Sequence, residues 1–319
     1  MTTELPWIPA DAVHALLPYA DLVDALAAGH LLPPADVRRT VYSPEGADEV
    51  YLGLPAWQPG RAIGVKLVTV FPGNLAVGKP SVQAVYVLFD GADGTPLATM
   101  DGTALTYRKT ACDSALGSRH LSRPDSRTLL MVGAGGLGPH LVAAHRTVRP
   151  SLTEVLVWNR TRSRAEVLAA ELAGSGVAAT VVDDLDGAVA RADIVCTATM
   201  TRDPLVKGAL LRPGTHLDLV GAYLPDHREV DDDCMRRAAI HVDSRLAAVE
   251  ESGDLVIPLA SGVITEHDIR GDLFDLCQGR VPGRTSSEEI TLFENGGGGH
   301  LDLMTGQVVW ERYRAAAAR

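Results

Sequence analysis

The sequence has few of the features that mark a secreted, membrane or metal-binding protein. Its 319 residues include four cysteines, and these show no paired spacing, which argues against a zinc site and gives no support to a disulfide framework. No apolar run approaches the length of a membrane span, and the first residues show neither a basic nor an apolar segment of a signal peptide. The ten histidines include no H-E-x-x-H pair, so we expect no metal. A cytoplasmic location is therefore expected.

The overall charge excludes another group of functions. The formal net charge is −11, which argues against nucleic acid or an anionic membrane as the main partner. The chain is 46% hydrophobic and 22% charged, as in an ordinary globular protein, and it is long enough for two domains.

The stretch from 128 to 161 has the strongest local pattern in the chain. A short apolar run ends at Val132, and Gly133, Gly135 and Gly138 then fit G-x-G-x-x-G. A helix-like segment and a second apolar run follow, so the order is strand, tight turn, helix and strand. In this context the glycines predict a dinucleotide site. Only glycine lets a pyrophosphate approach the backbone closely, and the free N–H groups at the helix start meet its charge.

The end of the second strand favours NADP(H) over NAD(H). NAD sites usually place Asp or Glu there, for the ribose 2′-OH, but this chain has Asn159, Arg160 and Thr161, with Arg162 and Arg164 close behind. A guanidinium can pair with a 2′-phosphate through two hydrogen bonds, and Arg160 is the expected partner. The alternative is that these arginines are a solvated helix start.

The alternation of strands and helices continues to about residue 242 and predicts a parallel sheet covered on both faces. Ligands of such sheets bind beyond the carboxyl ends of the strands, which places Gly133, Asn159, Thr199 and Gly221 around one crevice. The residues expected to contact the cofactor there are Gly133, Gly135, Gly136, Leu137, Gly138, Asn159, Arg160, Thr161, Arg164, Thr199, Met200, Gly221 and Ala222.

The segments outside this region predict a second domain. Residues 1–30 read as helical, with Asp11 and Asp21 at helix starts, and a helix is expected at 105–121. Short strand-like pieces separated by Pro and Gly turns predict a hairpin-rich sheet, at 37–42, 49–54, 62–71, 81–89 and 97–100. After residue 257 the alternation fades; a strand is expected at 286–293, a flexible or tightly turning loop at 296–299 and a helix from 306. The expected fold class is α/β, with a Rossmann doubly wound parallel sheet inserted in a second, α+β domain.

Several further stretches occur in a recognisable order: Val65-Lys66-Leu67-Val68-Thr69-Val70-Phe71-Pro72-Gly73-Asn74, Asp101-Gly102-Thr103-Ala104-Leu105-Thr106, Lys109-Thr110-Ala111, the glycine fingerprint and Ser252-Gly253-Asp254. Together they resemble the ornithine cyclodeaminase and μ-crystallin family, from about residue 54 to residue 302. The resemblance implies a homodimer and a small amino acid or cyclic imino acid substrate. It also implies that residues 1–122 and 303–319 form a substrate-binding and dimerisation domain, with the nucleotide domain, 123–302, inserted between them.

The resemblance also implies a set of substrate residues. Lys66 matches the active-site lysine of the family, although from the residues alone it reads as a strand lysine on a solvated face. Lys109 stands where the family usually has the arginine that holds the substrate carboxylate, so either Lys109 or the neighbouring Arg108 is the anchor. Arg38 and Arg39 are candidates for a second, upstream arginine, and Ser81 stands where the family has a small hydroxyl residue.

One departure bears on the reaction. Cyclodeaminases of the family carry an Asp where this chain has Tyr223, which argues against ornithine deamination. The run from Gly221 to Glu229 instead resembles ketimine reductases such as Δ1-pyrroline-2-carboxylate reductase, which commonly use NADPH. The resulting hypothesis is NADPH-dependent reduction of Δ1-pyrroline-2-carboxylate or Δ1-piperideine-2-carboxylate to proline or pipecolate.

Two alternatives remain open at this point. One is a cyclodeaminase or an amino-acid oxidoreductase that resembles alanine dehydrogenase, and the other is a non-catalytic binding protein, as in the crystallin branch. The family has a Lys-Ser-Val-Gly-Thr-like run where this chain has residues 294–298, so the resemblance places Gly297 near the nicotinamide.

Overall fold

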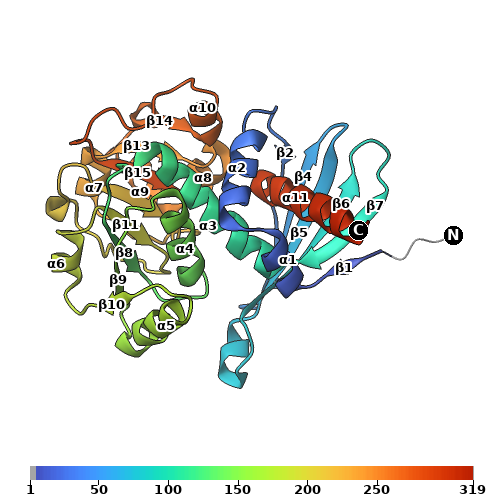
Figure 1. Ribbon diagram of the computed structural model, residues 1–319, viewed down its shortest axis with the longest axis horizontal. Coiled ribbons are helices and arrows are strands. Elements are labelled where there is room, and N and C mark those ends of the chain that lie inside the picture. Colours follow the sequence, from blue (N-terminus) through green and yellow to red (C-terminus); the bar gives the residue numbers. More distant parts are fainter. Residues whose placement is uncertain (1–4, 319) are drawn as a thin grey trace. The chain divides into compact units, whose positions relative to one another are not determined.

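The computed structural model describes residues 5–318, apart from the side chains of residues 75, 246 and 247. The chain forms two compact units (Figure 1): unit 1 is Met1–Lys109 with Gly298–Arg319, and unit 2 is Thr110–Gly297. The boundaries expected from the sequence, after residues 122 and 302, lie 13 and five residues further along the chain.

Unit 1 is built on a mostly antiparallel sheet that has seven strands among the described residues, in the order β1-β7-β6-β5-β4-β2, with β3 also paired to β4. The strands are β1 (Trp7–Ile8), β2 (Asp36–Val37), β3 (Thr40–Tyr42), β4 (Val50–Gln58), β5 (Ala62–Val70), β6 (Val82–Asp90) and β7 (Pro96–Asp101). Successive hairpins join β4 to β7. β1 lies in the segment 1–30 that was expected to be helical, so that expectation was wrong at residues 7–8, and the strand expected at 37–42 is two short strands.

The helices of unit 1 are α1 (Ala10–Leu16), α2 (Tyr19–Gly29), the first part of α3 (Gly102–Leu121) and α11 (Gly299–Ala317); a 3-10 helix spans Pro72–Val77. Asp11 and Asp21 lie in the first turns of α1 and α2 and are not the capping residues. An acidic side chain in the first turn still stabilises the helix through its interaction with the helix dipole. α11 packs on β4, β5 and β6. It starts seven residues before the expected residue 306.

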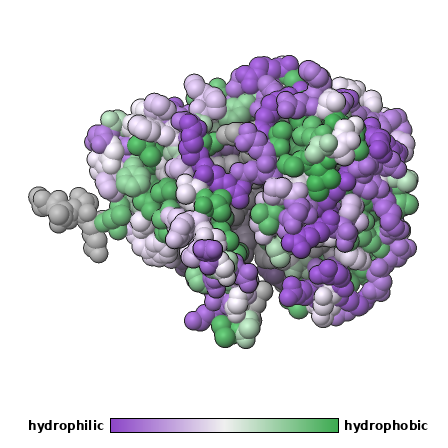
Figure 2. All heavy atoms as spheres, turned by 180° about the vertical axis from the view of Figure 1, so that it is seen from behind, coloured by the Kyte–Doolittle hydropathy of each residue, from purple (hydrophilic) through white to green (hydrophobic). Residues whose placement is uncertain are grey.

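The two faces of this sheet differ. Along β5 the side chains of Ala62, Lys66 and Val68 are buried, on the side of α11. The residues that alternate with them, and their neighbours in register, form a partly exposed outer face: Pro55, Trp57, Ile63, Val65, Leu67, Val85, Val87 and Phe89. Figure 2 shows hydrophobic residues at the surface of unit 1 on the reverse side.

Unit 2 is a doubly wound α/β unit, which confirms the expected fold class. Within the described part of the chain its sheet has eight strands, all parallel, in the order β10-β9-β8-β11-β12-β15-β13-β14. They are β8 (Thr128–Val132), β9 (Glu154–Trp158), β10 (Ala179–Val181), β11 (Ile194–Thr197), β12 (His216–Leu219), β13 (Ala239–Val242), β14 (Ile269–Asp272) and β15 (Thr291–Glu294). The winding reverses between β8 and β11, and a ligand site of such sheets lies at that point.

The connections of unit 2 are mostly helical: α4 (Gly138–Val148), α5 (Arg162–Gly174), α6 (Leu185–Val189), α7 (Asp232–Arg237), α8 (Arg245–Glu251), α9 (Gly253–Ala260) and α10 (Leu273–Cys277), with 3-10 helices at Gly208–Leu210 and Glu266–Asp268. The expectation that the alternation fades after residue 257 was wrong, because β14 and α10 continue it. These elements are short and α9 contains Pro258, so their periodicity is hard to see in the sequence.

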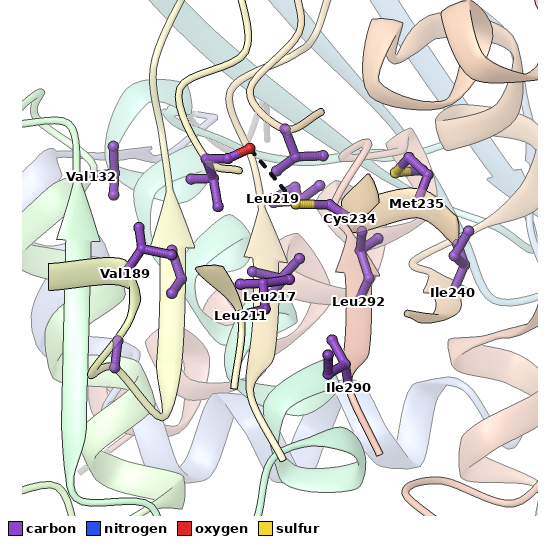
Figure 3. Close-up of a cluster of buried hydrophobic side chains, with 14 of the residues drawn as sticks. Val132, Val189, Leu211, Leu217, Leu219, Cys234, Met235, Ile240, Ile290 and Leu292 are labelled. Carbon is purple, nitrogen blue, oxygen red and sulfur yellow. Dashed lines mark hydrogen bonds between the residues drawn. The ribbon is translucent and has the colours of Figure 1, made fainter. Parts of the chain in front are cut away.

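A continuous apolar core lies on one side of the parallel sheet (Figure 3). Val132 on β8, Leu217 and Leu219 on β12 and Leu292 on β15 are fully buried there, with β11 lying between β8 and β12. This packing fixes the strands whose carboxyl ends carry the loops described below. No helix in the described part of the chain has the length and apolar character needed to cross a membrane.

Candidate active site and dinucleotide cradle

The turn after β8 needs glycine at its first position. Gly133 has a φ of 111°, and its N–H donates to the oxygen of Trp158 at 2.9 Å. A Cβ at this residue would lie 2.5 Å from the oxygen of Ala198. A side chain is therefore excluded by both the backbone conformation and the neighbouring strand end.

The other two glycines of the fingerprint have different roles. A Cβ at Gly138 would lie 3.0 Å from Cδ2 of Leu168, so this glycine allows α4 to pack against α5. A Cβ at Gly135 would meet nothing within 4 Å. The absence of a side chain at Gly135 thus leaves open space over the backbone, as a bound pyrophosphate requires.

A cavity of about 350 Å³ lies over this turn, lined by Ala134, Gly135, Gly136, Arg164, Val167, Leu168 and Glu171. Leu137 precedes α4 and provides no side-chain cap, so the first N–H groups of the helix are not capped by a side chain and suit an anion. The open glycine, the cavity and the helix start fit a dinucleotide.

Some of the residues after β9 form hydrogen bonds or ion pairs within the protein, and others have exposed side chains. Asn159 accepts a hydrogen bond from the N–H of Ala134 at 3.2 Å and donates to the oxygen of Thr161 at 2.9 Å, so it ties this loop to the glycine turn. Arg162 is engaged by Glu166 and Asp183. The side chains of the predicted residues Arg160, Thr161 and Arg164 are exposed, and Arg164 lines the cavity.

Glu229 joins the loops that follow β11 and β12. Its carboxylate accepts hydrogen bonds from the N–H and Oγ1 of Thr199, at 2.7 and 2.6 Å, from Oγ1 of Thr197 at 2.7 Å and from the N–H of Gly221 at 2.7 Å. A Cβ at Gly221 would lie 2.0 Å from the oxygen of Thr199. The two predicted cofactor loops therefore touch, and a buried carboxylate that sequence reasoning missed holds them.

Glu229 belongs to a group of buried acids. The N–H groups of Glu229 and Val230 donate to Asp254, and Oγ of Ser252 donates to Glu294 at 2.6 Å. Burial raises the pKa of Asp254 to about 8, with Glu229 adding to the effect, and burial also raises the pKa values of Glu229 and Glu294. The acids of this group therefore hold protons at higher pH than free carboxyl groups do.

The other residues predicted to contact the cofactor differ in burial and backbone conformation. Ala222 is buried, and Met200 is 73% exposed beside the hydroxyl of Tyr223. Gly297 has a φ of 75° and its N–H donates to Oδ2 of Asp243 at 2.5 Å. The loop at 296–298 is thus held by the side chain of Asp243, and it leads into α11, which begins at Gly299.

Lys66 lies inside unit 1 and does not occupy the solvated face that its strand position suggested. Its ammonium donates to Oδ1 of Asp302 at 3.1 Å and lies 2.9 Å from Oδ2, and both side chains are buried. Tyr86, the register partner of Lys66 on β6, is also fully buried. Burial raises the pKa of Tyr86, and the Asp302 carboxylate raises it further.

A second lysine is buried in the same unit. Lys109 is 2% exposed, and among the residues that the structure describes it forms no ion pair. Burial lowers the pKa of Lys66; Asp302 opposes this and Lys109 adds to it. Burial, followed by His30 and Lys109, lowers the pKa of His300 well below its ordinary value, so this imidazole is neutral at pH 7.

The remaining predicted substrate residues do not join these two lysines within unit 1. Nε of Arg108 donates to Nδ1 of His14 at 3.0 Å, and its guanidinium lies 4.1 Å from the ring centre of Tyr19. Arg39 is exposed, between β2 and β3. Ser81 precedes Tyr86 by five residues, which is about 16 Å along a strand.

One cluster in unit 2 has residue types that bind metals. Nε2 of His145 and the thiol of Cys196 each lie 2.9 Å from the same oxygen, Oδ2 of Asp218, and all three side chains are fully buried. Burial, and then Asp218, raises the pKa of Cys196, so the sulfur remains a thiol. His145 and Cys196 thus each form a direct hydrogen bond with Asp218.

The structure therefore combines a dinucleotide cradle in unit 2 with a buried Lys-Asp pair and a second buried lysine in unit 1. Sequence reasoning missed Asp302, Glu229 and Tyr86. For Asp302, the available signal was its position in the first turn of a helix with glycines before it; Tyr86 could have been found from its pairing with Lys66 in the hairpin.

Comparisons with known proteins show which family the chain belongs to. The model of the ornithine cyclodeaminase/mu-crystallin family matches residues 32–317. The chain is 46% identical over 288 residues to Δ1-pyrroline-2-carboxylate reductase of Paracoccus denitrificans, covering 90% of each chain, and 37% identical over 270 residues to mouse ketimine reductase mu-crystallin, covering 82% of this chain and 80% of the mouse protein. The structure of Thermococcus litoralis Δ1-pyrroline-2-carboxylate reductase with NADH and L-proline matches with a TM-score of 0.93, 30% identity and 98% of each chain covered.

The fold and the site define a pyridine-nucleotide-dependent oxidoreductase that acts on a carbon–nitrogen bond. The chain belongs to the ornithine cyclodeaminase/mu-crystallin family.

Proposed function

We propose that this protein reduces cyclic ketimino acids with NADPH, converting Δ1-pyrroline-2-carboxylate or Δ1-piperideine-2-carboxylate to proline or pipecolate. The observation that carries the proposal is the charge balance inside unit 1. Lys66 and Lys109 are both buried there, and of the two only Lys66 forms an ion pair among the described residues, with the carboxylate of Asp302. The relatives named as ketimine and pyrroline-carboxylate reductases support the same reaction.

An unpaired charge is costly to bury. Lys66 is matched by Asp302, whereas Lys109 has no anionic partner among the residues described. A substrate carboxylate would supply the missing anion. This argument favours Lys109 as the anchor, because the guanidinium of Arg108 is engaged by His14 and Tyr19.

The roles of the two lysines follow from this arrangement. Lys109 holds the carboxylate and so orients the ring. Lys66 donates a hydrogen bond, and then a proton, to the imine nitrogen, since a protonated imine is the better electrophile. The nicotinamide, when bound, supplies the hydride for the imine carbon. The cofactor preference for NADPH rests on Arg160 and Arg164, exposed beside the glycine turn with no carboxylate after β9.

We also propose that the active form is a homodimer joined through the outer face of the unit 1 sheet. That face has an apolar core of Val65, Leu67, Val85 and Val87, with Trp57 52% exposed beside it. Contiguous apolar surface of this kind marks protein–protein contact.

The first test is the loss of NADPH or NADH absorbance on adding each ketimine. Rapid loss with NADPH is expected. Loss with neither cofactor contradicts the proposal, and ammonia release from ornithine would then test the cyclodeaminase alternative.

The second test addresses Lys109 with a matched substrate. Δ1-Pyrroline has the same ring without the carboxylate, so the wild-type enzyme should discriminate against it by about 10²-fold or more, as expected for a charged hydrogen bond worth about 3 kcal/mol. Lys109→Met should remove most of this discrimination, mainly through KM. Equal discrimination in the variant would exclude Lys109 as the anchor.

A further inference from the structure

We propose that Asp302 is a positioning residue for this reaction: its carboxylate keeps Lys66 in the ammonium form and fixes the direction in which the proton is offered. This inference rests on the proposed function and adds a residue to it. The two side chains meet although 236 residues separate them, with Lys66 on β5 and Asp302 in the first turn of α11.

The geometry constrains the ammonium strongly. Nζ of Lys66 lies 3.1 Å from Oδ1 and 2.9 Å from Oδ2 of Asp302, so both oxygens face it. Asp302 itself is fully buried and Lys66 is 5% exposed. Since an ammonium has three N–H donors, binding to this carboxylate leaves the other donors for the substrate.

The surrounding charges show why a carboxylate is needed. Lys109, from α3, lowers the pKa of Lys66; Asp302 raises the pKa of Tyr86, from β6; and Lys109 lowers the pKa of His300, from α11. Burial and the second ammonium both lower the pKa of Lys66, and Asp302 is the group that raises it. Without Asp302, Lys66 would lose its proton at a lower pH, and the neutral amine could not act as the acid.

The proton step balances without a further reactant. One N–H bond of the Lys66 ammonium breaks as one forms on the imine nitrogen, while the carbon receives the hydride with its electron pair from reduced nicotinamide. Lys66 is left as a neutral amine and regains a proton from solvent. Asp302 remains a carboxylate throughout and favours that return.

The titration of Lys66 can be measured directly, without cofactor or turnover. The chain has lysines only at 66, 79, 109 and 207, so protein labelled with ¹³C at lysine Cε gives a small set of signals that Lys66→Met, Lys79→Arg and Lys207→Arg assign. In Asp302→Asn the pKa of Lys66 should fall by about 1–3 pH units, the effect of an adjacent opposite charge. Lys79 and Lys207 should titrate as in the wild type. An unchanged Lys66 overturns the inference.

Kinetics give the second readout. The basic limb of kcat/KM against pH should move to lower pH in Asp302→Asn by the same amount as the Lys66 titration. Asp21→Asn is the matched control, because Asp21, on α2, pairs at 3.1 Å with Arg312, which lies on α11 as Asp302 does. The pH profile of this variant should equal that of the wild type. A lower rate with an unmoved profile would indicate a merely structural role and overturn the inference.

A charge-preserving variant covers failure of Asp302→Asn to fold. Asp302→Glu keeps the charge but displaces it by one methylene, so Lys66 should stay protonated while kcat falls by about 10-fold or more, since a displacement of about 1 Å can cost 10²-fold. Wild-type kcat and KM in this variant overturn the inference. If wild-type enzyme reduces neither ketimine, the proposed function fails and the role of Asp302 in it fails too; an unmoved Lys66 titration with active wild type refutes only the inference.

Discussion

The carboxylate of Glu229 accepts a hydrogen bond from the N–H of Gly221 at 2.7 Å while its other oxygen accepts from Thr199. Glu229→Gln replaces one acceptor with an NH₂ donor that must face an N–H or O–H group. An unsatisfied buried group costs about 1–3 kcal/mol, so dinucleotide affinity should fall by roughly 5- to 150-fold. Fluorescence titration with NADPH measures this. Glu250→Gln, on the exposed side of α8, should bind as the wild type does; equal Kd values for both variants would show that the two loops do not need Glu229.

Gly133 and Gly135 make a matched pair. Gly133→Ala introduces a Cβ 2.5 Å from a backbone oxygen at a positive φ, so the melting temperature should fall by several degrees. Gly135→Ala meets no protein atom within 4 Å, so stability should be kept while dinucleotide binding weakens. Thermal unfolding and NADPH titration separate the two effects. Unchanged affinity in a stable Gly135→Ala variant would argue that no phosphate approaches this residue.

A comparison of substitutions at Arg160 and Arg162 distinguishes recognition of the cofactor from an effect of surface charge. Arg160→Gln should lower the NADPH-to-NADH ratio of kcat/KM by about 10- to 100-fold, the loss expected for a charged hydrogen bond. Arg162→Gln removes the same charge from a side chain engaged by Glu166 and Asp183, so its ratio should change less. Equal ratios in the two variants would mean that the preference depends on net charge alone.

The proposed dimer can be tested on the outer face of the unit 1 sheet. Val65→Glu places a charge at the centre of that face and should yield monomers in light scattering after size-exclusion chromatography. Val77→Glu is the control, because Val77 is 69% exposed at the end of the 3-10 helix, away from the strands. Dimers in Val65→Glu, or monomers in the wild type, would contradict an interface at this face.

The buried acids of unit 2 predict a pH dependence of stability. A carboxyl group whose pKa is raised by folding stabilises the fold below its unfolded pKa, and this contribution is lost as the pH rises through the folded value, about 8 for Asp254. Glu294→Gln removes one charge and keeps an oxygen for Ser252. Its melting temperature, relative to the wild type, should therefore be higher by a few °C at pH 8 than at pH 5. The same difference in melting temperature between variant and wild type at pH 5 and at pH 8 would exclude Glu294 as a source of this pH dependence.

Much of unit 2 could be predicted from local sequence. The spacing of Gly133, Gly135 and Gly138 between two apolar runs predicts the order strand, turn, helix and strand, and β8, α4 and β9 follow one another in that order. The alternation of strands and helices gave the parallel sheet for the same reason, because hydrophobic periodicity is a property of neighbouring residues. The short elements after residue 257 had too few residues to show a period.

Only the tertiary structure decided the polar contacts that complete the two sites. Lys66 follows the alternation of an ordinary strand lysine, and the packing of α11 on β5 is what buries it against Asp302. Glu229 reaches Thr199, 30 residues away, because adjacent parallel strands bring their carboxyl ends together. Such pairings depend on which elements pack side by side, a choice made by the burial of whole faces. No local pattern around either residue encodes it.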